Sequence, residues 1–325
     1  MERGAVKGRF APTPSGRMHL GNLLCALLAW LSARAEGGRV VLRIEDLDAM
    51  RSPRAYADLL EDDLRWLGLS WDEGGSSGGS DGPYYQSERT ALYRAALARL
   101  EEQGLVYPCF CSRAQLHAAQ APHLSDGRVL YSGACRDLSA QEVAQRRRER
   151  PPALRLRVSD ETVSFVDKHL GPYSENLQRE CGDFLVCRSD GVFAYQLAVV
   201  VDDAAMGVTQ VVRGADLLSS TPRQLYLYRL LGLPAPTFAH IPLLTAPDGR
   251  RLSKRDGDLD LGAIRRRLPG PEPLLGLLGW LCGLLERPEP VRAQELIPLF
   301  SWAKIPRGDL PLPASLWTLL GQRNV

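Results

Sequence analysis

Residues 9–44 read RFAPTPSGRMHLGNLLCALLAWLSARAEGGRVVLRI. The stretch begins as a short strand at 9–11 and then turns, because two prolines and a glycine cannot lie inside a helix. Leucines recur at helical spacing from His19 to Ala35, and Gly37-Gly38 ends that helix. The compact apolar run 40–44 predicts a buried strand. Strand, turn, helix and strand in this order predict the start of a parallel α/β fold.

The next segments alternate between helical and loop patterns. Residues 52–70 predict a helix, with Ser52 as its N-cap and Pro53 at its first position. The Gly- and Ser-rich run 74–82 predicts a flexible loop. A second amphipathic helix is expected at 88–104, closed by Gly104.

The pattern changes after residue 104. Cysteines and short pieces up to about 150 indicate an insertion. Residues 154–158 alternate like an exposed strand, and 193–201 and 210–212 read as β-rich runs. A helix is expected at 222–232, and the chain beyond 258 is helical with many prolines.

Bulk properties limit the class of protein. The 325 residues carry a net charge of only +2, and seven cysteines, an odd number, argue for a reducing cytosol rather than a disulfide scaffold. The N-terminus shows no apolar signal segment, and the apolar stretch 274–285 is too short to span a bilayer. We therefore expect a cytoplasmic protein with no membrane partner, and a monomer. Two arginine runs, 146–148 and 265–267, are either solvated helix faces or contacts to RNA phosphates.

The turn before the first helix is a candidate phosphate site. A helix N-terminus offers free N–H groups and partial positive charge. His19 lies where the helix begins and can donate to a phosphate oxygen, and Gly21 lets a flat ring approach the backbone. The plain alternative is an ordinary helix start capped by His19.

A second candidate lies more than 200 residues later, in the segment Arg251-Leu252-Ser253-Lys254-Arg255. A lysine beside a serine on a mobile loop can neutralise charge that grows on a polyphosphate. Taken alone, the segment is an ordinary basic surface loop. A P-loop is not expected, because the chain has no Gly-x-x-x-x-Gly-Lys-Ser/Thr motif.

Taken together, the two candidates resemble a known family. His19-Leu20-Gly21-Asn22 resembles the HIGH signature of class I aminoacyl-tRNA synthetases, and residues 251–255 resemble their KMSKS signature. Asn22 replaces the final His of the first motif, and Arg251 replaces the first Lys of the second. The resemblance implies a Rossmann-like parallel-sheet catalytic domain. It also implies that ATP, with Mg²⁺, binds at Pro12, His19, Gly21, Asn22, Ser253 and Lys254, with His19 and Lys254 as catalytic residues.

Three further stretches resemble the glutamyl/glutaminyl branch of that family. They are 9–16 (RFAPTPSG), 43–48 (RIEDLD) and the region from 193 to 224, which includes FAYQLAVVVDD, VRGAD and TPRQ. The resemblance runs from about residue 7 to about 265. It implies that L-glutamate binds at Arg9, Ala11, Thr13, Glu45, Tyr195 and Arg213.

The chemistry of these residues agrees with an acidic amino acid. Glu45, at the end of a buried strand, can hold the ammonium group. Arg9 and Arg213, on two separate strands, can bind the side-chain carboxylate through guanidinium forks, and Tyr195 adds a hydroxyl. Glutamine would place a neutral amide against a guanidinium and lose the charge pairing. The alternative is that Glu45 and Arg213 pair with each other or form surface ion pairs.

Cys109-x-Cys111 with Cys135 downstream predicts zinc. From general chemistry the fourth ligand would be His117 or His123. The resemblance implies Tyr131 instead, because related enzymes place a tyrosine four residues before the last cysteine. The zinc would be structural. The alternative is three reduced core cysteines. Cys25, Cys181, Cys187 and Cys282 are expected to serve packing.

The resemblance implies four regions: 1–104 and 191–257 as the halves of the catalytic domain, 105–190 as an inserted zinc-containing subdomain, and 258–325 as a short helical end without an anticodon-binding domain. This layout resembles the glutamyl-queuosine tRNA(Asp) synthetases. It implies tRNA-independent activation of glutamate and transfer to queuosine in the anticodon loop of tRNA(Asp). The alternatives are a truncated glutamyl-tRNA synthetase that charges a 3′ end, and a non-catalytic RNA-binding protein. A nucleotidyltransferase with a small-molecule acceptor is disfavoured by the glutamate-pocket residues.

Overall fold

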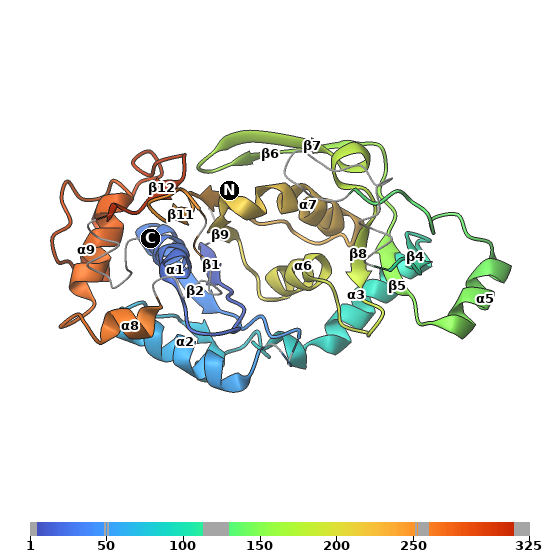
Figure 1. The fold of residues 1–325 in the computed structure, drawn as a ribbon, viewed down its shortest axis with the longest axis horizontal. Coiled ribbons are helices and arrows are strands. Elements are labelled where there is room, and N and C mark those ends of the chain that lie inside the picture. The colour runs from blue at the N-terminus through green and yellow to red at the C-terminus, as the bar shows by residue number, and fades with distance from the viewer. Residues whose placement is uncertain are drawn as a thin grey trace.

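A five-stranded parallel sheet forms the centre of the molecule (Figure 1). The computed structural model describes residues 5–48, 50, 52–112, 130–250, 252 and 260–314. The strand order is β10-β9-β1-β2-β3. The strands are β1 (Lys7–Phe10), β2 (Arg39–Leu42), β3 (Glu73–Gly74), β9 (Gln210–Gly214) and β10 (Thr237–Ile241). The predicted α/β class with a parallel sheet is confirmed.

The order of the strands locates the point where a ligand is expected. From β1 the sheet grows through β2 and β3 on one side, whereas β9 and β10 lie on the other. In doubly wound sheets the ligand crevice lies outside the carboxyl ends of the strands, where the strand order reverses. That point lies between β1 and β9.

Helix α1 (Leu20–Ala35) packs against β1 and β9. Most of its residues are buried on all sides, because the sheet covers one face and the C-terminal region covers another. Gly37 has φ +66°, which favours glycine, and a Cβ at Gly38 would lie 2.5 Å from the Val6 carbonyl oxygen. The two glycines therefore end the helix as expected and let the chain return closely along the sheet.

Helix α2 (Arg54–Trp66) begins one residue later than expected. Pro53 is the N-cap residue, with ψ 141°, and its ring provides no capping hydrogen bond. Ser52 is buried, and its hydroxyl has no partner among the described residues. The prediction of Ser52 as N-cap is therefore wrong, because Pro53 keeps an extended ψ and does not enter the helix.

The Gly- and Ser-rich run 74–82 is not the flexible loop expected. Gly74 ends β3, and a Cβ there would lie 2.0 Å from the Leu42 carbonyl oxygen, so the strand needs glycine to approach β2. The Glu61 carboxylate accepts from the Ser76 backbone at 2.6 Å, and Asp81 pairs with Lys7 at 2.5 Å. Gly74, Gly75 and Gly79 thus permit close approach, because a Cβ at each would lie 2.5 Å or less from another group.

The run 193–201 is helical from Tyr195 onward, so the prediction of a β-rich run is wrong except for an isolated β-bridge between Phe193 and Cys187. Helix α6 (Tyr195–Ala205) packs between α3 (Thr90–Glu102) and α7 (Thr221–Leu230), and its side chains from Leu197 to Asp203 are buried. Short apolar valine runs are ambiguous in sequence, and burial on several sides outweighs the β-preference of valine.

The insertion forms a second, antiparallel sheet. It contains β4 (Val106–Cys109), β5 (Ala153–Leu156) and β8 (Phe184–Cys187), with α5 (Ala140–Glu149) nearby, at the end of the molecule opposite α9 (Figure 1). The prediction of an exposed strand at 154–158 is wrong, because β5 is the central strand and Arg155 and Leu156 are buried.

A long hairpin connects the insertion to the central sheet. Strands β6 (Thr162–Asp167) and β7 (Gly171–Asn176) form this hairpin, which arches over α7 (Figure 1). Its tip reaches β10, where the Lys168 amide donates to the Phe238 carbonyl at 2.8 Å. The hairpin therefore places Asp167 beside the central sheet.

The C-terminal part packs on α1 and belongs to the same core. It contains α8 (Leu261–Arg265), α9 (Glu272–Leu281), α10 (Ala293–Leu296) and β12 (Leu310–Pro311), which pairs with β11 (Leu244–Thr245). Short 3-10 helices lie at Gly75–Ser77, Gln86–Glu88, Ala215–Ser220 and Ile297–Leu299, and a π-helical turn lies at Leu177–Cys181. Among the helices described, none has the length and apolarity needed to cross a membrane.

Candidate active site

A cavity of about 470 Å³ lies at the carboxyl ends of β1 and β9. The described residues that were predicted to bind glutamate or ATP all line it: Arg9, Ala11, Pro12, Thr13, His19, Gly21, Asn22, Glu45, Tyr195 and Arg213. Ser253 and Lys254 lie outside the described residues, but Leu252 is part of the wall. Residues that are far apart in the sequence thus share one cavity at the switch point of the sheet.

His19 forms the end of the cavity at α1. It is the N-cap of the helix, and its Nδ1 accepts from the Gly21 amide at 3.1 Å. Asn22 completes a capping box by accepting from the His19 amide. Because Nδ1 accepts, a neutral ring carries its proton on Nε2, which makes Nε2 a donor. The capping role and a phosphate-binding role are therefore compatible.

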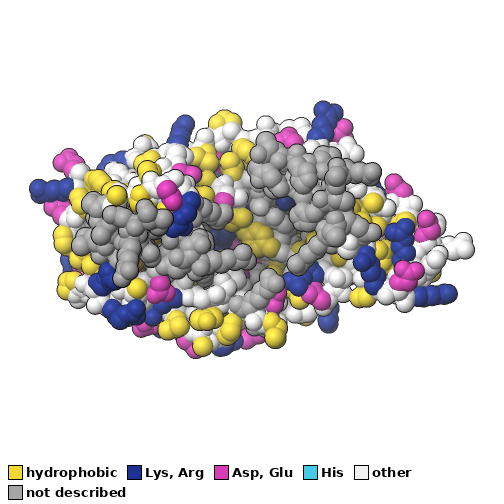
Figure 2. Space-filling view, in the orientation of Figure 1, with side chains coloured by type: hydrophobic (Ala, Val, Ile, Leu, Met, Phe, Trp, Pro, Cys, Tyr) yellow, Lys and Arg dark blue, Asp and Glu magenta, His cyan; other side chains and the backbone are white. Residues whose placement is uncertain are grey.

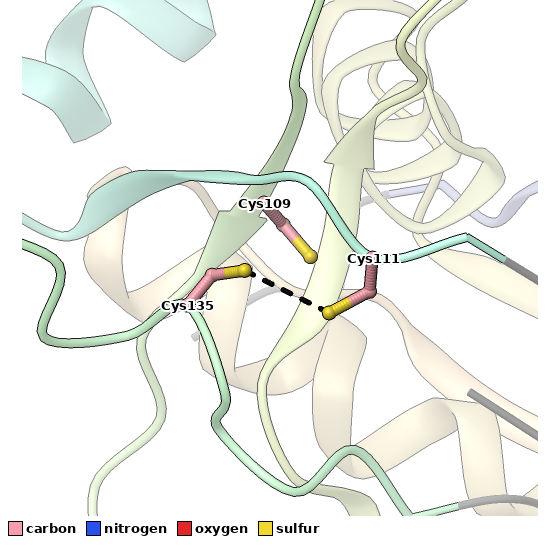
Figure 3. Close-up of side chains that lie close together, drawn as sticks. All are labelled: Cys109, Cys111 and Cys135. Atoms are coloured by element: carbon pink, nitrogen blue, oxygen red, sulfur yellow. Dashed lines mark hydrogen bonds between the residues drawn. The ribbon is translucent and has the colours of Figure 1, made fainter. Parts of the chain in front are cut away.

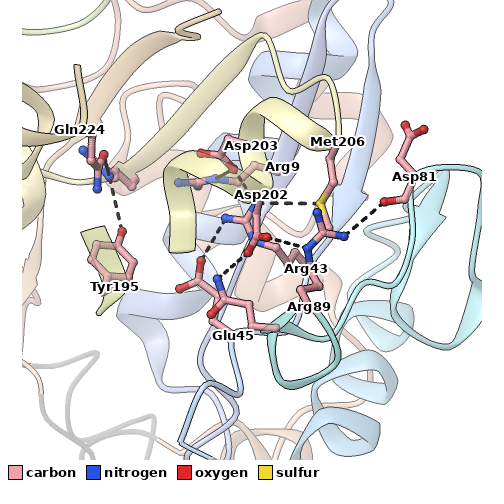
Figure 4. Close-up of polar contacts among 12 residues, drawn as sticks. Arg9, Arg43, Glu45, Asp81, Arg89, Tyr195, Asp202, Asp203, Met206 and Gln224 are labelled. Carbon is pink, nitrogen blue, oxygen red and sulfur yellow. Dashed lines mark hydrogen bonds and ion pairs between the residues drawn. The ribbon is translucent and has the colours of Figure 1, made fainter. Parts of the chain in front are cut away.

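Glu45 is buried and held by a neighbouring cation (Figure 4). One of its carboxylate oxygens accepts from Arg43 Nη2 at 3.0 Å. Burial raises the pKa of Glu45, and Arg43 and Arg9 oppose that rise. Arg43, not Arg213, is the cation that pairs with Glu45, so the alternatives of a Glu45–Arg213 pair and of a surface pair are both wrong.

Arg43 is the centre of a buried ion network (Figure 4). It is fully buried and pairs with Asp203 at 2.5 Å and with Asp202 at 3.8 Å. Asp202 in turn accepts from Arg89 Nε at 2.6 Å. Arg43, Asp202 and Asp203 were not among the predicted site residues, although alternation along an extended chain places Arg43 and Glu45 on one face.

Arg213 is a buried cation that hydrogen bonds to uncharged side chains hold in place. Its side chain is 3% exposed, and it donates to Gln224 Oε1 at 2.8 Å, Thr221 Oγ1 at 2.7 Å and His240 Nε2 at 3.0 Å, with the Tyr195 hydroxyl at 3.4 Å. The amide, the two hydroxyls and the unprotonated imidazole that accept these bonds carry no charge. Within the described part of the chain, no carboxylate forms an ion pair with it.

The environment of Arg213 favours an anionic ligand. Burial lowers the pKa of Arg213, although a guanidinium still keeps its charge at neutral pH. A buried charge is costly unless it is paired. A carboxylate that enters the cavity would supply the missing partner.

Arg9 lies on the neighbouring strand and is buried as well. Its Nη1 donates to the Val212 carbonyl at 3.1 Å, whereas its Nε has no hydrogen-bond partner among the described residues. Burial also raises the pKa of Tyr195, so its phenol stays neutral and can donate. The walls therefore present two guanidinium groups and one hydroxyl.

Cys25 packs against the core around α1, as expected. It is partly exposed and lines the cavity. Burial raises the pKa of its thiol to about 11, so the sulfur stays protonated. Cys25 shapes the wall but does not supply a thiolate nucleophile at neutral pH.

The three cysteines of the insertion come together in space (Figure 3). The sulfurs of Cys109, Cys111 and Cys135 all lie within 4.8 Å of one another, with Cys111 and Cys135 3.7 Å apart. The Tyr131 hydroxyl lies 3.6 Å from Cys109 Sγ and 3.9 Å from Cys111 Sγ. His117 and His123 lie outside the described residues. The three cysteines and Tyr131 thus form one compact donor group.

The thiols of this group differ in acidity. Burial opposes ionisation of Cys109, but the Cys111 amide, the Tyr131 hydroxyl and Arg155 lower its pKa. The pKa of Cys111 rises to about 12, because of burial and the neighbouring cysteine sulfurs. A divalent cation at the centre would reverse that rise, since a metal favours thiolates.

The two arginine runs have different surroundings. In the first run Arg147 and Arg148 are exposed, whereas Arg146 is half-buried and its Nη1 lies 4.0 Å from Cys135 Sγ. In the second run, Arg265 pairs with Asp62 and Asp63, and Arg17 reaches the same Asp63 carboxylate at 2.6 Å. Arg265 thus fastens α8 to α2 and to the turn that precedes His19.

Comparisons with known proteins agree with this geometry. The family model for the catalytic domain of class I tRNA synthetases (E and Q) matches residues 5–295. A glutamyl-Q tRNA(Asp) synthetase of Symbiobacterium thermophilum is 55% identical, with 94% of this chain and 96% of the relative covered. A protein of the same name from Nitratidesulfovibrio vulgaris is 48% identical, with 96% and 97% covered.

Longer relatives also match. A glutamate–tRNA ligase of Alkalilimnicola ehrlichii is 48% identical, with 85% of this chain but 58% of the relative covered. Among solved structures, a glutamate-tRNA synthetase of Elizabethkingia anophelis superposes with a TM-score of 0.83 at 28% identity, with 98% of this chain and 70% of the other covered.

Proposed function

The chain belongs to the class I tRNA synthetases of the E and Q branch, within the group of glutamyl-Q tRNA(Asp) synthetases. From this premise we propose that it activates L-glutamate with ATP in the absence of tRNA. We further propose that it transfers the glutamate to queuosine in tRNA(Asp). The observation that carries the glutamate part is the buried Arg213 without a carboxylate partner in the described part of the cavity. The relatives' names support the acceptor.

The cavity can hold glutamate by three charged contacts. Glu45, with one oxygen on Arg43, would receive the ammonium group. Arg213 and Arg9, on adjacent strands, would receive the side-chain carboxylate, and Tyr195 would donate to it. Ala11 and Thr13 line the wall between these groups and would contact the substrate backbone.

ATP would occupy the end of the cavity at α1. Its phosphates would lie at the helix N-terminus, with His19 Nε2 as a donor, and its ring would pack over Gly21 near Pro12 and Asn22. Mg²⁺ accompanies ATP, and Ser253 and Lys254 would close on the phosphates. Glutamate and ATP would then both lie in the one cavity, within hydrogen-bonding distance of its lining residues.

The reaction has two steps. A glutamate α-carboxylate oxygen attacks the α-phosphorus of ATP, the bond to the bridging oxygen breaks, and pyrophosphate leaves with the electron pair. A hydroxyl of the queuosine base then attacks the carbonyl carbon of glutamyl-adenylate, loses its proton, and AMP leaves. Orientation and charge stabilisation account for the first step, with His19 and Lys254 as the catalytic groups.

Activity should follow the acceptor base. We expect glutamate-dependent ATP–pyrophosphate exchange without tRNA, and transfer of labelled glutamate to queuosine-containing tRNA(Asp) but not to the same tRNA lacking queuosine. After nuclease digestion the label should lie on the anticodon-loop nucleoside. Label on the 3′-terminal adenosine would instead show a glutamyl-tRNA synthetase that charges tRNA ends. Absence of exchange would support a non-catalytic RNA-binding protein.

We further propose that the insertion, residues 105–190, holds one structural zinc ion. In a tetrahedral site with Zn–S bonds of about 2.3 Å, sulfurs lie roughly 3.8 Å apart. The observed 3.7 Å between the sulfurs of Cys111 and Cys135 fits this value. The Tyr131 hydroxyl, 3.6 Å from Cys109 Sγ, is close enough to complete the ligand set. Zinc would tie the loop after β4 to the segment around Cys135.

The group around the cysteines also provides supporting contacts. Arg155 Nε donates to Cys109 Sγ at 3.3 Å, and the Phe110 amide donates to Cys135 Sγ at 3.4 Å. Such donors orient the ligands and offset the excess negative charge of several thiolates on one divalent ion.

Outside this insertion, residues 1–104 and 191–257 would form the catalytic domain, with 258–325 as its helical end.

The fourth ligand can be identified by metal analysis. We expect one zinc ion per purified chain and near-complete loss of zinc in Cys111→Ser. In Tyr131→Phe we expect the zinc affinity to fall by roughly 10- to 100-fold, as large an effect as the loss of a group that hydrogen-bonds to a metal ligand. Zinc would be measured by mass spectrometry and by competition with a chromogenic chelator. Cys282→Ser is the control, because Cys282 is buried in the core around α1 and not in the cysteine group of the insertion. Full affinity in Tyr131→Phe, with loss in His117→Ala or His123→Ala, would assign a histidine instead.

A further inference from the structure

A buried histidine connects Arg213 to a carboxylate outside the cavity. His240 on β10 is fully buried, and its Nε2 accepts from Arg213 Nε at 3.0 Å. Its Nδ1 lies 2.6 Å from Asp167 Oδ2. Asp167, at the end of β6, is also buried, and neither residue lines the cavity. The three side chains form a chain from the hairpin to the substrate site.

The contacts determine which ring nitrogen carries the proton. Asp167 Oδ1 accepts three backbone amides, from His169 at 3.0 Å, Leu170 at 2.9 Å and His240 at 3.2 Å. Oδ2 is thus the acceptor for His240, which therefore holds its proton on Nδ1. Nε2 must be an acceptor, because both the Arg213 Nε–H and the Thr221 hydroxyl (3.2 Å) approach it.

The charge states of His240 and Asp167 agree with this arrangement. Burial lowers the pKa of His240, so the ring is neutral at neutral pH. Burial opposes ionisation of Asp167, but its bonds to His240 and to the backbone lower its pKa overall, so it is a carboxylate. A protonated ring or the other tautomer would direct an N–H against the Arg213 N–H.

We propose that Asp167 and His240 are a positioning pair that orients Arg213 and thereby selects a carboxylate, rather than an amide, in the substrate; this rests on the proposed function of Arg213. A guanidinium has five N–H groups. His240, Gln224, Thr221 and the Tyr195 hydroxyl each accept from one of them, which holds the group by both ends and leaves one N–H for the ligand. The pair acts through Arg213 and does not touch the substrate.

Asp167→Asn tests the proposal with an almost unchanged side-chain shape. Three backbone amides require the oxygen of the new amide at the Oδ1 position, so its NH₂ group must face His240. The ring then has to accept at Nδ1 and carry its proton on Nε2, opposite the Arg213 N–H. We expect the glutamate KM to rise about tenfold or more, the ATP KM to change less than about twofold, and the preference for glutamate over glutamine to fall about tenfold.

The tautomer can be observed without any activity measurement. The chain has five histidines, so ¹⁵N-histidine labelling gives few ring signals. A two-bond proton–nitrogen spectrum should show His240 protonated on Nδ1 in the wild type and on Nε2 in Asp167→Asn. Asp160→Asn, an exposed carboxylate near the other end of the hairpin, should change neither spectrum nor kinetics.

A second pair of variants keeps the test open if Asp167→Asn does not fold. His240→Gln retains an oxygen that can accept from Arg213, whereas His240→Leu offers none, so the glutamate KM should rise clearly more in His240→Leu. The proposal is overturned if folded Asp167→Asn keeps the wild-type glutamate KM, or if glutamate and ATP KM values rise together. If wild-type protein shows no glutamate-dependent exchange, the proposed function fails, while the tautomer spectrum still reports on the pair.

Discussion

Replacing Arg213 by glutamine is expected to raise the glutamate KM in ATP–pyrophosphate exchange by roughly 30- to 4,000-fold. Removal of one partner of a buried charge pair costs about 2–5 kcal/mol of binding, and each ~1.4 kcal/mol is a factor of ten. Part of that cost arises because the substrate carboxylate would be left buried and unpaired. The ATP KM should change little, because His19 and the start of α1 stay intact.

The same variant should not destabilise the free protein strongly. Arg213 is buried without a carboxylate partner among the described residues, so its removal relieves a desolvation cost. We expect an unfolding midpoint equal to or higher than that of the wild type, in thermal scans without ligand. Arg229→Gln, an exposed arginine on α7 that pairs with Glu161, is the matched control. An unchanged glutamate KM in Arg213→Gln would remove the basis of the glutamate proposal.

Asp202→Asn is expected to lower the free energy of unfolding by about 3–5 kcal/mol, the usual loss when one partner of a buried ion pair is removed. Asp202 is fully buried and accepts from three donors: Arg89 Nε at 2.6 Å, Gln86 Nε2 at 2.8 Å and the Tyr93 hydroxyl at 2.9 Å. An amide must turn its NH₂ group toward at least one of them. It also leaves the buried Arg89 without its carboxylate.

Denaturant unfolding followed by fluorescence would measure this loss. Asp137→Asn is the matched control, because Asp137 is 88% exposed and its pair with Arg157 spans 3.4 Å. We expect the control to stay within about 0.5 kcal/mol of the wild type. Equal stabilities of the two variants would mean that water reaches the Arg43–Asp202–Arg89 network and screens it.

The errors of the sequence predictions have physical causes. The valine run of α6 favours a strand by intrinsic preference, but packing between α3 and α7 makes it a helix. The glycines at 74–82 suggested mobility, whereas Gly74 permits a backbone approach that a Cβ would block. Local preference decides neither case, because the partners lie far away in sequence.

The sequence by itself determined the α/β fold and the identities of the side chains around the cavity, because helical spacing, strand patterning and the turn at 12–16 are local. It also indicated that the three cysteines of the insertion form one group. Only the tertiary structure decided the protonation and pairing of these groups: that Glu45 pairs with Arg43, that Arg213 has no described carboxylate beside it, and that His240 connects it to Asp167. Pairing of buried charges depends on distances of a few ångströms between strands and a hairpin that are remote along the chain, and no local pattern encodes those distances.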